Sequence, residues 1–103
     1  MVRRRSPARG RLLADMGENI KRWRKLQGMS ATQLADRAYV TRETLRHIET
    51  GTGSPRLDSV MAVLGVLGLA ETVVSHTNPF NSDAGRALMD DQLEVDDRGK
   101  PNP

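Results

Sequence analysis

Apolar side chains recur every three or four positions along most of the chain, and this spacing predicts helices and no strands. The predicted helices cover residues 12–27, 31–38, 42–50, 57–67 and 83–93. Gly28 stands where the first helix should stop, and Ser30 and Thr41 stand where the next two should begin. Hydroxyl side chains suit these starts because they accept hydrogen bonds from the free N–H groups of the first turn. The pattern therefore predicts an all-α fold.

One stripe on each of the first four helices is predicted to face the core. In chain order its members are Leu12 or Leu13, Met16, Ile20, Trp23, Leu34, Ala35, Ala38, Leu45, Ile48, Leu57, Val60, Met61, Leu64 and Leu67. Val63 and Val66 are also apolar but lie off the stripe of the 57–67 helix, so we expect this helix to be covered on more than one face. The apolar stretch 69–74, a second copy of the chain, or both could provide the cover.

Composition narrows the function classes. Hydrophobic residues make up 37% of the 103 residues, which is enough for one small core. No apolar run of about 18 residues is present and the N-terminus has no apolar signal segment, so we expect a soluble, cytoplasmic protein without a membrane partner. The chain has no cysteine and two histidines, and we find no phosphate-binding glycine loop and no nucleophile with a paired base. We therefore expect no enzyme, no metal and no cofactor.

Charge is distributed unevenly, although the net charge is only +3. Residues 1–30 carry nine Lys and Arg against two acids, residues 31–56 carry four against three, and residues 57–103 carry three against eight. A basic first half favours a polyanion such as nucleic acid, whereas an acidic second half is usually solvated and sometimes docks on a basic partner.

The same features divide the chain into four predicted parts. These are a flexible basic arm (residues 1–11), a helical domain (12–76), a helical extension (77–95) and a disordered tail (96–103). The arm is either a solubilising tail or a segment that touches DNA. The extension could serve dimerisation, binding of a partner protein, or solubility.

Two short helices joined by a tight turn, residues 31–38 and 42–50, form a helix-turn-helix pattern. The inward positions of this pair are Leu34, Ala35, Val40, Leu45 and Ile48. The outer face of the second helix then presents polar and charged side chains that can bond base edges and phosphates, as a protein that inserts a helix into the major groove requires.

The residues at these positions are similar to those of one family from about Leu12 to Leu69. The chain contains Met16-Gly17-x-x-Ile20-x-x-Trp23-Arg24, Gly28-Met29-Ser30-x-x-x-Leu34-Ala35 and Val40-Thr41-Arg42-x-Thr44-Leu45-x-x-Ile48-Glu49-x-Gly51, followed by Pro55. This pattern resembles the lambda-repressor-like, XRE-type helix-turn-helix domain. The resemblance implies a compact five-helix domain, here with a short C-terminal helical extension, and a bacterial or phage DNA-binding regulator that is usually dimeric.

The resemblance also implies which residues contact DNA, with residues 41–50 as the recognition helix. Base contacts are expected from Arg42, Glu43, Arg46 and His47. Arg42 is the best candidate for a guanine contact because its fork matches the two acceptors of that base. Glu43 either accepts from cytosine or only holds Arg42 or Arg46 in place, and His47 is either near a base or solvated. Phosphate contacts are expected from Ser30, Thr32, Gln33, Thr41, Thr52, Ser54 and Arg56. Arg24 and Glu49 match a structural ion pair between the first helix and the end of the third.

Three positions depart from the family pattern. Ala31 stands where a glutamine commonly bonds a phosphate and braces the recognition helix, so this contact is absent or comes from Thr32 or Gln33. Tyr39 stands where a glycine with positive φ is usual, at a cost of roughly 1–2 kcal/mol unless the turn is reshaped. Arg56 replaces a capping hydroxyl before the 57–67 helix.

These observations predict a small transcriptional regulator, more specifically a repressor that binds duplex DNA as a homodimer. Two-fold symmetry would match a pseudo-palindromic operator with half-sites roughly 34 Å apart. One alternative is an antitoxin that neutralises a toxin-like partner protein through its C-terminal segment and regulates its own operon. Another is an interaction module that keeps the fold without binding DNA.

Overall fold

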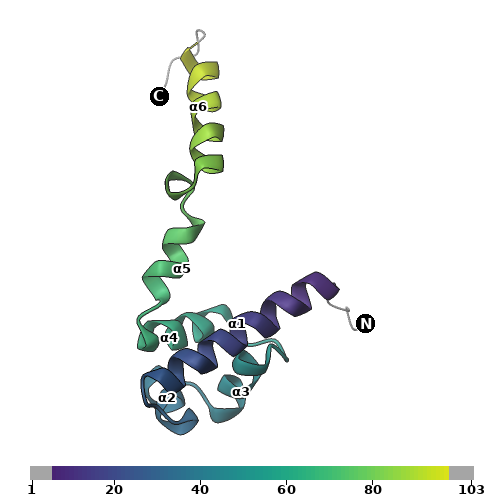
Figure 1. Ribbon diagram of the computed structural model, residues 1–103, viewed down its shortest axis with the longest axis vertical. Coiled ribbons are helices and arrows are strands. Elements are labelled where there is room, and N and C mark those ends of the chain that lie inside the picture. The colour runs from purple at the N-terminus through teal and green to yellow at the C-terminus, as the bar shows by residue number, and fades with distance from the viewer. Residues whose placement is uncertain (1–5, 98–103) are drawn as a thin grey trace. The chain divides into compact units, whose positions relative to one another are not determined.

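The computed structural model describes residues 6–97, and this part of the chain is helical without a strand. Its elements are α1 (Pro7–Leu26), α2 (Ala31–Ala38), α3 (Arg42–Thr50), α4 (Leu57–Leu67), α5 (Ala70–Thr77), the 3-10 turn η1 (Pro79–Asn81) and α6 (Asp83–Asp97). Figure 1 shows these elements in chain order. The predicted all-α class is confirmed. The chain divides into a first unit that ends at Ala70 and a second unit that begins at Glu71.

The start of α1 corrects the predicted extent of the basic arm. The Ser6 hydroxyl accepts from the Arg9 N–H at 3.1 Å, and Pro7 occupies the first helical turn, where its missing N–H is not needed. Residues 7–11 are therefore helical, although the arginine-rich composition suggested a flexible arm. Residues 1–5 lie outside the described part of the chain.

The core of the first unit comes from all four of its helices. Its buried apolar residues are Ile20, Met29, Leu34, Ala35, Ala38, Leu45, Ile48, Val63, Leu64 and Leu67. Val63 lies off the stripe and is fully buried, as expected for a helix covered on more than one face, and the cover comes from α1, α2 and α3. Of the alternatives Leu12 and Leu13, Leu13 is half-buried and Leu12 is exposed, whereas Trp23 and Leu57 were predicted to face the core but are 44% and 75% exposed. They lie towards the ends of α1 and α4, where the neighbouring helices no longer cover them.

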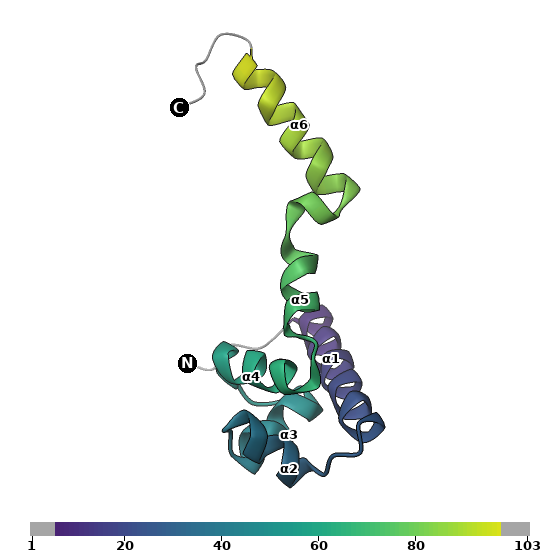
Figure 2. The same ribbon diagram turned by 90° about the vertical axis from the view of Figure 1, so that its left-hand side faces the viewer.

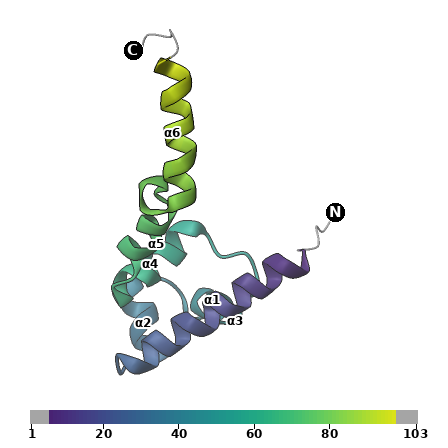
Figure 3. The same cartoon turned by 45° about the horizontal axis from the view of Figure 1, so that its top comes forward.

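Small residues bring α1 and α3 into close contact, and Figure 3 shows α1 passing along α3. A Cβ atom on Gly17 would lie 2.6 Å from the Glu49 carbonyl oxygen, so any larger residue would push the helices apart. At the end of α3, Gly51 has φ of 69° and its Cα faces the backbone of Leu13 and Ala14. The Gln27 amide donates to the Leu67 carbonyl at 2.8 Å and so ties the end of α1 to the end of α4. These contacts fix α3 on the surface of the unit.

The second unit is held by polar contacts around η1, which joins α5 to α6 (Figure 2). The Asn81 amide donates to the Ser75 carbonyl at 3.0 Å, and Arg86 Nε donates to the Phe80 carbonyl at 2.8 Å. Within residues 71–92, where side chains are described, none is buried. The contacts divide the chain after Ala70, within the first turn of α5, and the predicted domain boundary after residue 76 stays a prediction.

Two further findings concern the ends and the surface of the molecule. Helix α6 extends to Asp97, beyond the predicted end of the extension at residue 95, and the rest of the predicted tail, residues 98–103, lies outside the described part. Within residues 6–97 no single helix is long and apolar enough to cross a membrane; only α4 and α5 taken together as a bent pair pass that test of length and composition.

Candidate nucleic-acid interface

The start of α2 is fixed by a reciprocal cap. The Ser30 hydroxyl accepts from the Gln33 backbone N–H at 3.1 Å, and the Gln33 side-chain oxygen Oε1 accepts from the Ser30 backbone N–H at 2.8 Å. Both residues are exposed, and both were predicted to contact phosphate. The side-chain amide nitrogen of Gln33 is not used in this cap. It can only donate hydrogen bonds, which suits binding of an anion. The three-residue spacing of Ser30 and Gln33 is typical of a capping box, so the sequence alone indicates this cap.

The turn between α2 and α3 keeps its usual backbone without the usual glycine. Tyr39 adopts φ 56° and ψ 41°, in the left-handed region, and its side chain is 95% exposed. The turn is therefore not reshaped, and the strain expected at this residue, roughly 1–2 kcal/mol, is present. The hydrogen bond from the Val40 N–H to the Ala35 carbonyl at 3.0 Å closes the turn and holds the strained residue in place.

Helix α3 begins with a cap and with an arginine that reaches back to α2. The Thr41 hydroxyl accepts from the Thr44 N–H at 3.0 Å. One terminal nitrogen of Arg42 donates to the Thr32 hydroxyl at 2.6 Å. This bond bridges the first turns of α2 and α3, which is the brace that Ala31 cannot provide. Thr32 was one of the two residues expected to supply the brace if it was kept, and it was also predicted to contact phosphate.

Farther along α3, Glu43, Arg46 and His47 form one connected group. Arg46 donates to Glu43 Oε1 at 2.6 Å, and the same terminal nitrogen lies 3.1 Å from His47 Nε2. The hydrogen bond and the charge of Arg46 lower the pKa of the Glu43 carboxyl, so this exposed group stays ionised at neutral pH. Of the two partners left open for Glu43, the structure selects Arg46 and not Arg42.

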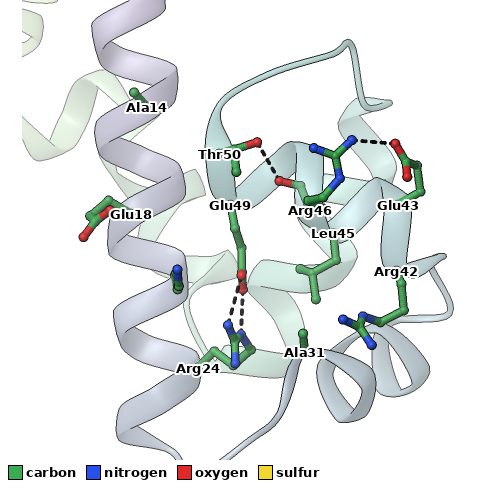
Figure 4. Close-up of a pocket in the computed structure, with 11 residues that line it drawn as sticks. Ala14, Glu18, Arg24, Ala31, Arg42, Glu43, Leu45, Arg46, Glu49 and Thr50 are labelled. Atoms are coloured by element: carbon green, nitrogen blue, oxygen red, sulfur yellow. Dashed lines mark hydrogen bonds and ion pairs between the residues drawn. The ribbon is translucent and has the colours of Figure 1, made fainter.

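A groove of about 560 Å³ runs between α1, the start of α2 and the side of α3 (Figure 4). Its lining residues are Ala14, Glu18, Lys21, Arg24, Ala31, Arg42, Glu43, Leu45, Arg46, Glu49 and Thr50. Ala31 contributes only a methyl group to this wall, so the absence of the family's glutamine leaves room beside Arg42. Lys21 on α1 also lines this groove and adds a positive charge to it.

The base of the groove is closed by an ion pair. Arg24 Nε donates to Glu49 Oε2 at 2.7 Å, and a terminal nitrogen donates to Oε1 at 3.1 Å, as the paired dashed lines of Figure 4 show. A further Arg24 nitrogen donates to the Met29 carbonyl at 3.1 Å. Both ionic side chains are only 9% exposed, so removal of one partner would leave the other charge buried without compensation. The expected ion pair is therefore present, and it joins α1 to the end of α3.

The loop after α3 presents the remaining predicted phosphate ligands. Thr52 and Ser54 are exposed, and the Thr52 hydroxyl lies 2.7 Å from that of Thr50. Gly53 lies beside the His47 ring, and an added Cβ would lie 2.8 Å from a ring carbon, so a larger residue here would displace this histidine. Arg56 forms no side-chain cap for α4 and instead pairs with Asp58 at 3.4 Å. An exposed ion pair of this kind is weak and can yield to a phosphate.

The comparison with protein families identifies this arrangement. A family model described as helix-turn-helix matches residues 20–74, which is more than half of the chain and includes α2, α3 and all groove-lining residues except Ala14 and Glu18. No curated protein and no solved structure gives a significant match.

Proposed function

The chain belongs to the helix-turn-helix family of XRE- and lambda-repressor-like DNA-binding regulators, and on that basis we propose that it is a repressor that binds a pseudo-palindromic operator as a homodimer. One α3 helix of each protomer would enter the major groove, with half-sites about one helical turn, roughly 34 Å, apart. Occupation of a promoter by the dimer would block transcription.

The observation that carries this proposal is the outer face of α3. Arg42, Glu43 and Arg46 are exposed side by side, and the ion pair of Arg24 with Glu49 holds the helix that bears them. Hydrogen-bonding side chains on a fixed helix are what discrimination between base edges requires. His47 completes the face and lies beside Gly53.

Phosphate contacts on both sides of α3 would set the register of the helix in the groove. The first turn of α2 offers Ser30, Thr32 and Gln33 together with backbone N–H groups, and Thr41 begins α3. The loop beyond α3 offers Thr52, Ser54 and Arg56. Such contacts release counterions, so affinity should fall steeply as salt rises.

Fluorescence anisotropy tests this proposal directly. We expect the full chain to bind duplex DNA from its own upstream region, or a duplex selected from a random library, more tightly than a scrambled duplex, with a preference that Arg42→Ala removes. The lost discrimination should be about 1–3 kcal/mol. Absence of binding to any duplex at low salt would overturn DNA binding as the function.

Sedimentation tests the homodimer and locates its interface. A dimer that persists in a chain ending at Asn78 would place the interface within residues up to α5, for example on α4, whereas a monomer would place it on η1 and α6. A full chain that sediments as a monomer even on the operator would refute the dimer.

The second candidate function, neutralisation of a toxin-like partner, is favoured by the surface of the second unit. Phe80 and Leu88 are 65% and 67% exposed, and Asp83 and Asp90 lie on the same helix as Leu88. Exposed apolar side chains among acidic residues are typical of a protein interface with a basic partner. Co-expression with the product of the adjacent gene would test this function: rescue of growth by the full chain, but not by a chain ending at Asn78, is the expected result.

A further inference from the structure

The two arginines on the outer face of α3 are held in different ways. Arg42 is bound by the neutral hydroxyl of Thr32 and has no ion pair within the described residues, so its positive charge is uncompensated. Arg46 is bound by the carboxylate of Glu43 at 2.6 Å, so the two charges largely cancel. The outer face of α3 thus presents one positive charge without an ion-pair partner among the described residues, on Arg42. It also presents one carboxylate, on Glu43, that Arg46 holds in place.

The bond to Thr32 prepares Arg42 for a base with two acceptors. It occupies one terminal nitrogen of the guanidinium and leaves the other terminal nitrogen and Nε free to donate. It also restricts a long side chain that would otherwise lose rotamer entropy on binding. Guanine presents two acceptors, N7 and O6, in the major groove, and is the base that matches this fork.

Glu43 is positioned to bind a base that donates a hydrogen bond. Its Oε1 accepts from Arg46 and lies 3.3 Å from His47 Nε2, and no hydrogen bond to Oε2 is found within the described residues. An ionised carboxylate can only accept, so it disfavours the acceptor edges of guanine and thymine. Cytosine offers an amino donor without a neighbouring acceptor on the same base, whereas adenine places N7 beside its amino group.

We propose that Thr32 and Arg46 are positioning residues, which hold Arg42 over a guanine and Glu43 over a cytosine of a neighbouring base pair. The operator half-site then contains G and C at adjacent pairs, and Arg46 contacts no base itself. This inference rests on the proposed function, since it assigns the bases that the same face of α3 contacts.

Selection from a randomised duplex library, followed by anisotropy on the selected duplex and its single-base variants, tests the assignment with the full chain. We expect replacement of the guanine to weaken binding by about 5- to 150-fold in the wild type. Thr32→Val, which keeps the side-chain shape and removes the hydroxyl, should reduce this ratio several-fold, and Thr32→Ser should restore it. Thermal melting of each variant checks that the fold is intact, as expected at an exposed position.

Variants of the second pair give an independent result. Glu43→Gln should change the preferred base from cytosine to adenine, because a glutamine amide matches the amino group and N7 of adenine. Arg46→Ala should weaken the cytosine preference and leave the guanine preference unchanged.

Each contrary outcome has one meaning. If Thr32→Val lowers affinity for all duplexes equally and reduces the salt dependence, Thr32 contacts phosphate and does not position Arg42. If Arg46→Ala removes a preference at a third base pair, Arg46 itself contacts a base. If selection yields a preferred sequence without adjacent G and C, the base assignment is wrong while the proposed function stands. If selection enriches no sequence, the proposed function fails as well.

Discussion

The first unit and the second unit are both helical, but different forces hold them. The first unit buries apolar residues from four helices and encloses an ion pair. Exposed charged side chains of this unit lie on the outer face of α3. In the second unit no described side chain is buried, and hydrogen bonds around η1 connect α5 to α6. Precise placement of a recognition face requires the first kind of construction, because hydrogen bonds to base edges tolerate little movement.

The contrast also appears in the apolar side chains left exposed. In the second unit Val74, Phe80 and Leu88 are more than half exposed, although each of them lies in a helix. Helices of this length gain little stability without burial of an apolar face. A helix in this chain is therefore not evidence of a core. Substitutions in the two units should separate stability that comes from apolar burial from stability that comes from hydrogen bonds.

The largest effect is expected from breaking the buried ion pair of the first unit. Arg24→Met leaves the Glu49 carboxylate without a partner at 9% exposure, and should lower the free energy of unfolding by about 3–5 kcal/mol. Chemical denaturation followed by circular dichroism measures this loss. The double variant Arg24→Met/Glu49→Leu removes both charges and should recover most of it. A single variant as stable as the wild type would show that the pair does not support the unit.

The next effect concerns the contact of α1 with α3. Gly17→Ala places a Cβ 2.6 Å from the Glu49 carbonyl oxygen and should destabilise the first unit by about 2–3 kcal/mol, because two helix backbones must separate. Gly65→Ala is the matched control on α4, where no atom lies within 4 Å of the added Cβ. There the better helix propensity of alanine should stabilise by about 0.5–1 kcal/mol. Equal effects in both melting curves would contradict the close packing.

The turn before α3 should give a smaller gain. Tyr39→Gly relieves a left-handed backbone and loses almost no packing, since the tyrosine is 95% exposed. Glycine makes the unfolded chain more flexible, so the net stabilisation should be about 0.5–1 kcal/mol. The matched control is Gly28→Ala, which introduces a Cβ at φ 74° and should destabilise by about 1 kcal/mol. Destabilisation by Tyr39→Gly would show that the tyrosine ring stabilises the turn despite its high exposure.

The sequence predicts local features of the first unit well. The caps at Ser30 and Thr41 and the all-α class follow from spacing and residue type, because they depend on contacts within a few residues. The family follows from a residue pattern that extends from about Leu12 to Leu69. The pairing of Arg24 with Glu49 came from the resemblance and not from spacing.

Features that depend on packing between helices were not predictable from periodicity. The apolar Val63 indicated a second covered face of α4, but periodicity did not identify α1, α2 and α3 as the helices that cover it. Leu57 is exposed because it is the first residue of α4, a position that the stripe does not distinguish from the middle of the helix. The bond of Arg42 to Thr32 depends on the crossing of α2 and α3. In the second unit the helical pattern of α6 was found, but periodicity gives no information on whether a partner covers the apolar face.

The smallest effect is expected in the second unit. Phe80→Ala should change the free energy of unfolding by no more than about 0.5 kcal/mol, because the ring is 65% exposed and its backbone carbonyl, not its side chain, binds Arg86. The matched control in the first unit is Leu45→Ala, which removes a side chain that is 1% exposed and should cost about 2–5 kcal/mol. Both are measured by denaturation at two protein concentrations. A loss above about 1 kcal/mol for Phe80→Ala that grows with protein concentration would show that a second copy covers this ring, and that the second unit obtains its core from association.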